Sequence, residues 1–435
     1  MYMRLKHVPY FLLCDVGPEL KEDMEAGQAM DITSTTEYPT LAEAAATPAA
    51  KNEEKAIGHN AYLEYLHHVE RQQQPYTDLE LNTLTNFQDW LQSPLQPLSD
   101  NLESVTYEVF EGDPVKYNQY ELAIEEALRE WSDLKKPTSS PDGVVIAVAG
   151  SGRGPLVTRA LQASETTGVP IKVWAVEKNP NAYVYLLRQN QAVWGGRVTV
   201  VKTDMRAWKG PVVSPSGDDG EPVYGKVDIL VSELLGSFGD NELSPECLDG
   251  IQHVLAPSHG ISIPSSYTAH LSPISTPRLF ADIKSRRHQG DPNAFDTPWV
   301  VRLFAIDFVS QRVPGHGRFQ QAWEFEHPLP QATMDTVAVR RSGGVVGGGG
   351  GSMAGGVGAN DHNTRECHLT FVCRSRGVIH GLAGYFEAVL YASQIEAGED
   401  GNSPKVELSI LPDMIDQKSK DMVSWFPIFF PLKAS

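Results

Sequence analysis

The chain has few cysteines and no long hydrophobic run. Its four cysteines form no CxxC pair, which excludes a zinc ribbon or a disulfide framework and favours a reducing compartment. They are Cys14, Cys247, Cys367 and Cys373. No stretch approaches the roughly 20 apolar residues of a membrane-spanning helix. The apolar segment VPYFLLCDV contains Pro9 and precedes no small-residue cleavage site, so we expect a buried strand there rather than a signal peptide.

Positive charge is also scarce. Lys and Arg total 36 against 55 Asp and Glu, and the formal net charge is -19. This excess of acids argues against a nucleic-acid backbone as the main partner and favours a basic protein or peptide. The hydrophobic share of 41% and the charged share of 21% are typical of folded globular proteins. A chain of 435 residues is long enough for two or three domains.

Composition divides the chain into four parts. Residues 1–74 include an acidic segment at about 18–58, rich in Glu, Ala, Thr and Pro, which we expect to be disordered. Residues 75–136 form a connecting segment with apolar side chains at helical spacing. These side chains are Tyr117, Tyr120, Ile124, Leu128 and Trp131. Residues 137–264 alternate strand and helix patterns, whereas residues 265–435 contain short strand-like pieces.

The third part predicts a parallel, doubly wound α/β sheet. Its strand-like runs are VVIAVAG, KVWAVE, RVTVV and KVDILVSE, and the first is apolar throughout, as a strand buried on both faces should be. Pro155 suits the first turn of the helix that follows this strand. Ser244 and Pro245 predict the N-cap and first turn of another helix, which we expect to run to Leu255.

The fourth part predicts an antiparallel β domain, a barrel or a sandwich. Its candidate strands are VVRLF, FQQAWEFE, CHLTFVC and VIHGLAGYFEAVLY, without helices long enough to cover a parallel sheet. A glycine-rich stretch at residues 342–360 interrupts this domain, and we expect a flexible, solvated loop without a function of its own.

Glycines follow the first strand of the α/β part. Gly150, Gly152 and Gly154 let the backbone turn sharply and let a ligand approach the main chain. The spacing G-x-G-x-G lacks the third glycine of the dinucleotide fingerprint, and no Walker lysine follows. A phosphate-binding loop is therefore disfavoured, and a dinucleotide oxidoreductase is a distant alternative.

Acidic residues end three successive strands. Glu177 stands where an acid reaches ribose hydroxyls, Asp204 can accept from an exocyclic amine, and Met205 can lie against a flat ring. Glu233 ends the fourth strand of the set. Each acid alone could merely cap a strand or helix. Together they indicate an adenosine-containing ligand without phosphates, which S-adenosylmethionine fits because its sulfonium tolerates acidic surroundings.

The stretch SELLGSFGDNELSPE places Glu233 and Glu242 nine positions apart in a hairpin-like loop. Two carboxylates can bind the edges of a planar guanidinium through paired hydrogen bonds. This binding would localise the positive charge and leave one terminal nitrogen nucleophilic toward a methyl donor. The alternative is that both acids pair with internal lysines or arginines. Their position in the ligand crevice favours the guanidinium clamp, and no metal is expected.

The quoted motifs resemble a known family. SELLGSFGDNELSPECLDG, with AVEKNPNA, TVVKTDMRAW and SGRGPLV, is similar to the type II, symmetric-dimethylating protein arginine methyltransferases, from about residue 60 onward. The resemblance implies an α/β fold: a Rossmann-like class I S-adenosylmethionine-dependent methyltransferase domain, followed by an antiparallel β-barrel. It also implies that residues 1–74 are the remnant of an N-terminal TIM-type barrel, and that the C-terminal barrel is incomplete.

The resemblance implies roles for individual residues. Glu233 and Glu242 would be the catalytic guanidinium clamp. The other residues would bind either the cofactor or the substrate. The cofactor-binding residues would be Tyr107, Lys116, Tyr117, Gly150, Gly152, Glu177, Asp204 and Met205, with Lys116 meeting the cofactor's carboxylate. The substrate-binding residues would be Phe110, Ser424 and Trp425, with Phe110 allowing the symmetric product.

Partners and location follow from the same resemblance. Arginine-containing proteins such as histone tails and Arg/Gly-rich proteins would be substrates, a WD-repeat protein and further copies of the chain would be partners, and the location would be cytoplasmic and nuclear. Two alternatives stay open: a methyltransferase for a small molecule or nucleic acid, and a catalytically impaired homologue that acts as a binding or scaffold protein.

Overall fold

The computed structural model describes residues 67–68, 71–72, 87–215, 220–343, 360–373, 376–393 and 404–433. The expected N-terminal strand, the acidic segment at 18–58 and residues 344–359 of the glycine-rich stretch lie outside the described residues. The chain divides into two units, Met1–Gln88 and Asp89–Ser435, and the second contains everything discussed below. Within the described part, no helix has the length and apolarity that a membrane span requires.

The α/β part is built around a parallel sheet of five strands, in the order β3-β2-β1-β6-β7. The strands are β1 (Val144–Ala149), β2 (Ile171–Glu177), β3 (Val198–Lys202), β6 (Ile229–Ser232) and β7 (Ile261–Ile263). The helices are α4 (Ser104–Glu111), α5 (Pro114–Asp133), α6 (Pro155–Thr167), α7 (Pro180–Ala192) and α8 (Ser244–Ile251), with short 3₁₀ turns η4 (Met205–Ala207) and η5 (Gln252–Val254). The parallel, doubly wound sheet predicted from the sequence is confirmed.

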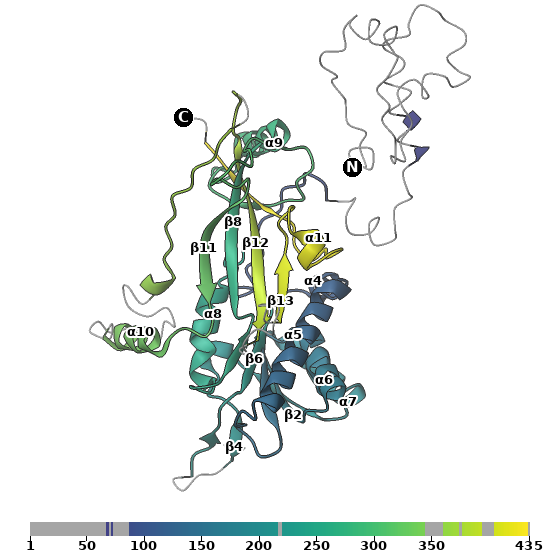
Figure 1. The fold of residues 1–435 in the computed structure, drawn as a ribbon, viewed down its shortest axis with the longest axis vertical. Helices are drawn as coiled ribbons and strands as arrows, with labels where there is room; N and C mark the ends of the chain where they lie inside the picture. Colours follow the sequence, from purple (N-terminus) through teal and green to yellow (C-terminus); the bar gives the residue numbers. More distant parts are fainter. Residues whose placement is uncertain are drawn as a thin grey trace, which may run out of the picture. The chain divides into compact units, whose positions relative to one another are not determined.

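A small antiparallel hairpin, β4 (Val212–Ser214) with β5 (Val223–Tyr224), stands apart from this sheet. In Figure 1, α5, α6 and α7 lie on one side of β6, and α8 lies on the other. The helices thus cover both faces, and every residue of β1 is buried, which explains its uninterrupted apolar sequence.

The strand order places a ligand crevice at the carboxyl ends of β1 and β6. These two strands pair in parallel, with Ala149 opposite Ser232. On its other edge β1 pairs with β2, the next strand along the chain. The chain therefore runs outward in opposite directions from β1 and β6, and such a reversal opens a crevice above the strand ends. Gly150 and Glu233 are the first residues beyond the two strands, so both border this crevice.

The helix predicted in the connecting segment is α5, which begins at Pro114 behind the N-cap Asp113. Its predicted apolar face is buried as expected, from Tyr117 to Trp131. Contacts with α6 and β7 join α5 to the parallel sheet, and contacts with β12 and β13 join it to the antiparallel sheet. The helix therefore forms the shared core between both sheets.

The C-terminal part is antiparallel, as the sequence predicts. Its strands are β8 (Ser266–Ser275), β9 (Trp299–Val300), β10 (Asp307–Phe308), β11 (Gln320–Glu326), β12 (Gly381–Ala392), β13 (Lys405–Ser409) and β14 (Ile428–Pro431). The main path is β10-β8-β12-β14-β9, with β11 added to β8 and β13 added to β12. The long strands β8 and β12 form its centre (Figure 1).

Several local predictions were wrong. The C-terminal part contains helices that the strand-like pattern did not indicate, namely α9 (Pro277–His288), α10 (Gln331–Gly343), the 3₁₀ turn η6 (Asp361–Asn363) and the short α11 (Ile415–Lys418). The run CHLTFVC forms only an isolated bridge, at Cys373, and VVRLF contributes only its first residue to β9. Beyond Val300, which pairs with Ile428 of β14, neither run continues the sheet; of the run CHLTFVC, Leu369 and Phe371 pack against a small core cluster.

The N-terminus of α8 also differs from expectation. Ser244 is the first helical residue, and Leu243 is the N-cap, with a left-handed φ of 64° and no side-chain capping bond. The helix ends at Ile251 and continues as η5, so the predicted run to Leu255 contains two helix types. The sharp turn at Leu243 directs the chain from the acidic loop into the helix.

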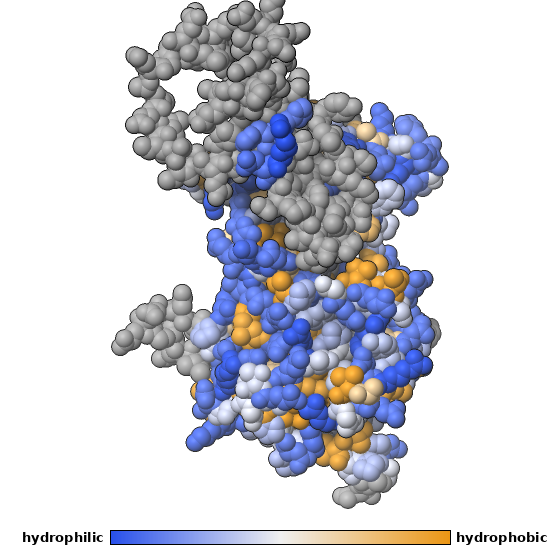
Figure 2. Space-filling model, turned by 90° about the vertical axis from the view of Figure 1, so that its right-hand side faces the viewer, coloured by the Kyte–Doolittle hydropathy of each residue, from blue (hydrophilic) through white to orange (hydrophobic). Residues whose placement is uncertain are grey.

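Among the described residues seen in Figure 2, most are polar, and the hydrophobic ones form small, separate patches. This distribution is ordinary for a folded protein, and the described residues visible in this view form no single large apolar surface.

Candidate active site

The glycine turn after β1 has a backbone that only glycine adopts readily. Gly150, Gly152 and Gly154 have φ values of 70°, 53° and 93°, in the left-handed region. A Cβ on Gly152 would lie 2.9 Å from Cε1 of Tyr107, and a Cβ on Gly150 would lie 3.2 Å from Cε of Met205. Tyr107 and Met205 therefore border the turn, as the sequence analysis expected.

Glu177 anchors this turn from the end of β2. Its carboxylate accepts hydrogen bonds from the N–H of Gly152 and the N–H of Asn179, both at 2.7 Å. Burial raises the pKa of Glu177, and the backbone N–H groups of Asn179, Gly152 and Lys178 oppose that rise. A carboxylate has about four lone-pair positions, so these three protein donors leave an acceptor position for a ligand hydroxyl.

Tyr107, on α4, lies against the same glycine turn. Asn179 donates from its amide nitrogen to the Tyr107 hydroxyl at 3.3 Å. Burial and the nearby Glu177 carboxylate raise the pKa of Tyr107 to about 12, so its hydroxyl stays a neutral donor at physiological pH.

Asp204, a predicted cofactor residue, already has a partner within the chain. Its carboxylate receives the Arg206 side chain at 3.0 and 2.7 Å and the Arg206 backbone N–H at 2.9 Å. The Arg206 guanidinium lowers the pKa of Asp204. The carboxylate thus caps the η4 turn and forms an internal ion pair, a structural role that the sequence analysis had weighed only in general terms.

The loop between Glu233 and Glu242 is a hairpin, as predicted. Gly236 and Gly239 form an isolated antiparallel bridge, and the Asn241 side chain accepts from the N–H of Phe238 at 2.7 Å. The loop therefore folds back on itself, which returns Glu242 to the neighbourhood of Glu233.

The two carboxyl groups differ in environment. Burial first, and then the Glu233 charge, raise the pKa of Glu242 to about 8, while Lys116 partly offsets the rise. Glu233 accepts from the Lys116 ammonium at 3.2 Å and from the N–H of Leu235 at 3.3 Å. A pair of acids sharing one site in this way favours a cationic ligand, because a second positive charge would let both ionise.

Lys116 lies among aromatic rings. Its side chain is 1% exposed, and its Nζ lies 5.4 Å from the ring centre of Phe110, 4.8 Å from that of Tyr117 and 5.0 Å from that of Trp425. An ammonium within about 6 Å of such rings is stabilised by their electron-rich faces. The predicted cofactor residue Tyr117 and the predicted substrate residues Phe110 and Trp425 thus surround the buried Lys116 ammonium, which pairs with Glu233.

Trp425 and Ser424 reach the site from the segment before β14. The indole N–H of Trp425 donates to the carbonyl of Leu235 at 2.8 Å, which joins this segment to the acidic hairpin. The Ser424 hydroxyl donates to Asp113 at 2.7 Å and therefore points at the N-cap of α5. The structure brings both residues to the site, but the hydroxyl of Ser424 already has a protein partner.

Sequence reasoning missed two charged residues. Asp113 caps α5, which the Asp-Pro pair at the start of a helix could have suggested, and it also binds the segment of Ser424, which no local pattern indicates. Arg153, within the glycine turn, forms ion pairs with Glu108 at 2.8 Å and Glu111 at 3.2 Å on α4. No sequence signal pairs Arg153 with those acids, because they lie more than 40 positions away.

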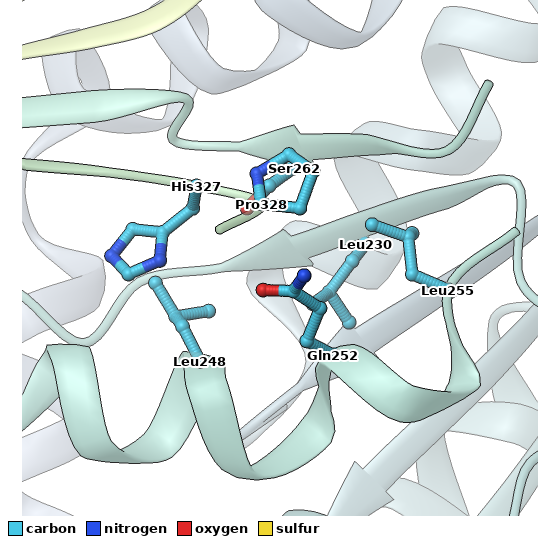
Figure 3. A pocket seen from close by; sticks show the side chains of 7 residues that line it. All are labelled: Leu230, Leu248, Gln252, Leu255, Ser262, His327 and Pro328. Carbon is cyan, nitrogen blue, oxygen red and sulfur yellow. The ribbon is translucent and has the colours of Figure 1, made fainter. Parts of the chain in front are cut away.

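One small cavity lies away from these residues, between α8, β6, β7 and the end of β11 (Figure 3). It is lined by Leu230, Leu248, Gln252, Leu255, Ser262, His327 and Pro328. The Gln252 amide is engaged with both the N–H and the carbonyl of Leu329, and burial lowers the pKa of His327 to about 3. Because the His327 imidazole is neutral and both ends of the Gln252 amide are bonded to Leu329, the cavity has no charged group to bind a charged ligand.

The residues at the crevice fit S-adenosylmethionine. The glycine turn admits a ligand close to the backbone, Glu177 keeps an acceptor position for a ribose hydroxyl, and Lys116 is a buried cation that suits a carboxylate. In the part of the chain that the structure describes, no group of three or more His, Cys, Asp or Glu side chains is arranged to hold a metal ion.

Comparisons with known proteins agree with the motifs. Residues 78–263 match the family model described as PRMT5 arginine-N-methyltransferase, and residues 266–435 match the PRMT5 oligomerisation domain. A solved structure, that of Arabidopsis thaliana protein arginine methyltransferase 10, is 15% identical with a TM-score of 0.49, covering 76% of this chain and 83% of that one.

Curated relatives are closer in sequence. Protein arginine N-methyltransferase skb1 of Schizosaccharomyces pombe is 42% identical over 374 residues, which are 86% of this chain and 50% of that protein. Protein arginine N-methyltransferase 5 of Xenopus laevis is 40% identical over 375 residues, 86% of this chain and 49% of that protein. This chain spans about half the length of the curated relatives it matches. With both family models matched in succession, the chain belongs to the PRMT5 family of protein arginine N-methyltransferases.

Proposed function

We propose that this chain transfers methyl groups from S-adenosylmethionine to the guanidinium nitrogens of arginines in other proteins. The observation that carries the proposal is the convergence of Glu233 and Glu242 beside the glycine turn, at the crevice between β1 and β6. The relatives named as protein arginine N-methyltransferases support it, although they are about twice as long as this chain.

The cofactor would lie against the glycine turn. Glu177 would accept from the ribose hydroxyls, Met205 would lie against the adenine, and α4 with Tyr107 would cover the ligand. When bound, S-adenosylmethionine supplies an electrophilic methyl group. Asp204 would contribute indirectly, by holding the η4 turn through Arg206.

Glu233 and Glu242 would act as the clamp for the acceptor guanidinium. A permanently protonated guanidinium lowers the pKa of a nearby carboxyl, so its arrival would favour the ionised form of Glu242. The two carboxylates would neutralise the cation and hold one terminal nitrogen toward the crevice. Such positioning can remove roughly 7 to 11 kcal/mol of an activation barrier.

Aromatic side chains would shape the acceptor site. Trp425 and Phe110 flank the Lys116 ammonium beside Glu233, and their rings would limit the orientations open to a methylated guanidinium. Phe110 would thereby favour monomethylarginine and symmetric dimethylarginine as products.

Partners and location are part of the same proposal. An acidic chain suits basic substrates, such as histone tails and Arg/Gly-rich proteins. The match to an oligomerisation domain supports assembly into oligomers, and a WD-repeat protein is the proposed further partner. The proposed location is the cytoplasm and the nucleus.

Incubation of the full chain with methyl-labelled S-adenosylmethionine and an Arg/Gly-rich histone-tail peptide tests the proposal. Fragmentation of the peptide in the mass spectrometer would identify the modified side chain, and symmetric dimethylarginine is the expected product. A folded chain that binds the cofactor but transfers no methyl to any arginine peptide would favour the scaffold alternative. Transfer to small molecules or nucleic acid alone would favour a different methyltransferase.

A further inference from the structure

Asp113 connects two segments that are far apart in the sequence. Its side chain is buried, and both carboxylate oxygens are in use. Oδ1 accepts from the N–H of Val115 at 2.9 Å and from the N–H of Lys116 at 3.3 Å, in the first turn of α5. Oδ2 accepts from the N–H of Val423 at 2.8 Å and from the Ser424 hydroxyl at 2.7 Å.

Each segment carries a residue of the candidate active site. Lys116 lies in the first turn of α5, and Trp425 directly follows Ser424. The Lys116 ammonium lies 5.0 Å from the centre of the Trp425 ring, so the two segments that Asp113 joins also meet through these two side chains. Among the described residues, Asp113 provides the one recorded acceptor for both the Val423 N–H and the Ser424 hydroxyl.

We propose that Asp113 is a positioning residue, whose carboxylate holds the Val423–Trp425 segment against the first turn of α5 and thereby sets the place of Trp425 beside Lys116. The inference rests on the proposed function, because Trp425 matters as a wall of the acceptor site. Ser424 then acts through Asp113, and its hydroxyl does not touch the acceptor arginine.

The chemistry requires a carboxylate at this position. A carboxylate is an acceptor at both oxygens, which suits four donors arriving from two sides. Asparagine has one acceptor oxygen and is an equally good N-cap, so Asp113→Asn can keep the cap of α5. Its NH₂ group would then face the Val423 N–H, donor against donor, and the bridge to the second segment would be lost while the helix start is kept.

Hydrogen exchange of the full chain, followed by mass spectrometry, tests the bridge directly. In Asp113→Asn we expect the amides of the Val423–Trp425 segment to exchange at least tenfold faster, with the first turn of α5 nearly unchanged. Ser424→Ala should give a smaller increase in the same segment. Unchanged exchange at these amides in Asp113→Asn overturns the proposal, and so does a loss of protection confined to α5.

A buried aspartate elsewhere gives a matched control. Asp89 is 7% exposed and accepts from the N–H groups of Phe304 and Ala305 at 2.9 and 3.1 Å, so its carboxylate holds a different segment from Val423–Trp425. Asp89→Asn should lower stability in a similar way but leave the exchange of the Val423–Trp425 segment unchanged. If Asp113→Asn does not fold, Ser424→Ala and Ser424→Val replace it in the experiment, because they remove only the hydroxyl donor.

Kinetics separate positioning from a structural role. In Asp113→Asn the KM for an Arg/Gly-rich peptide should rise at least fivefold, while the Kd of S-adenosylhomocysteine, measured by calorimetry, stays within twofold. Asp89→Asn should change neither. The double variant Asp113→Asn/Ser424→Ala should be no worse than Asp113→Asn, because both residues act through one bridge.

The outcomes separate this inference from the proposed function. Additive losses in the double variant would mean that Ser424 contacts the substrate itself, which overturns the inference. A wild-type chain that methylates no arginine peptide would overturn the proposed function, and the exchange experiment would still decide whether Asp113 holds the segment.

Discussion

At the scale of single residues, Glu233 and Glu242 carry the strongest prediction. Glu233→Gln keeps the size of the side chain but removes the charge that the clamp requires, and it puts an NH₂ group in the place of one acceptor oxygen. We expect kcat for an arginine peptide to fall about 100-fold or more, as for other preorganised charge-stabilising groups. Turnover within a few-fold of the wild type would refute the clamp.

Glu242 makes the proposed reaction sensitive to pH. Its pKa is raised to about 8 by burial and by Glu233, and the clamp needs the ionised form. We therefore expect kcat/KM to rise about tenfold per pH unit from pH 6 to near pH 8, and then to level off, since kcat/KM reports ionisations of the free enzyme. A flat profile across that range, in a single-turnover assay, would show that Glu242 does not need to ionise.

The same carboxyl predicts an effect on stability. Because the pKa of Glu242 is higher in the folded chain than in the unfolded one, the folded state holds more protons between about pH 4.5 and pH 8. Its contribution to stability is then lost as the pH rises through this window. Glu242→Gln should show a smaller fall in Tm between pH 6 and pH 9 than the wild type, measured by differential scanning calorimetry in matched buffers.

At the scale of elements, α4 depends on Arg153. This helix has no fully buried residue, and Arg153 pairs with Glu108 and Glu111 on it and stacks over Tyr185 at 4.3 Å. Arg153→Ala should loosen α4 and weaken S-adenosylhomocysteine binding about tenfold or more, measured by calorimetry. Arg197→Ala, which removes the exposed pair with Glu165 at 2.9 Å, is the control and should leave binding unchanged.

The start of β6 depends on a buried carboxylate. Asp228 is fully buried and accepts from the Ser139 hydroxyl at 2.6 Å, from the Ser139 N–H at 3.0 Å and from the Val145 N–H at 2.8 Å. It ties the linker before β1 to both central strands. Asp228→Asn replaces an acceptor by a donor, and we expect it to lower the free energy of unfolding by about 2–4 kcal/mol in urea titrations. A loss below about 0.5 kcal/mol would mean that the network rearranges freely.

At the scale of the whole molecule, α5 links the two sheets of residues 89–435. Leu128 is fully buried in this shared helix, so Leu128→Ala should cost about 2–5 kcal/mol. Because the helix packs on both sheets, we expect β1 and β12 to lose exchange protection together, as one cooperative unit. If β12 kept its protection while β1 lost it, the two sheets would be independent folding units.

The sequence by itself determined the parallel sheet, the glycine turn and the acidic hairpin. These features depend on local chemistry: an apolar run for a strand buried on both faces, glycine for positive φ, and the short spacing between Glu233 and Glu242. The helical face of α5 was equally local, because a period of 3.6 residues can be read directly from the order of its apolar side chains.

Only the tertiary structure decided how these pieces serve one site. It placed the Lys116 ammonium between Glu233 and Trp425, engaged Asp204 with Arg206, and joined Asp113 to a segment 310 positions away. It also decided which apolar runs of the C-terminal part join the sheet. The physical reason is that hydrogen bonds and ion pairs between distant segments depend on how the elements pack, and no periodicity along the chain records that packing.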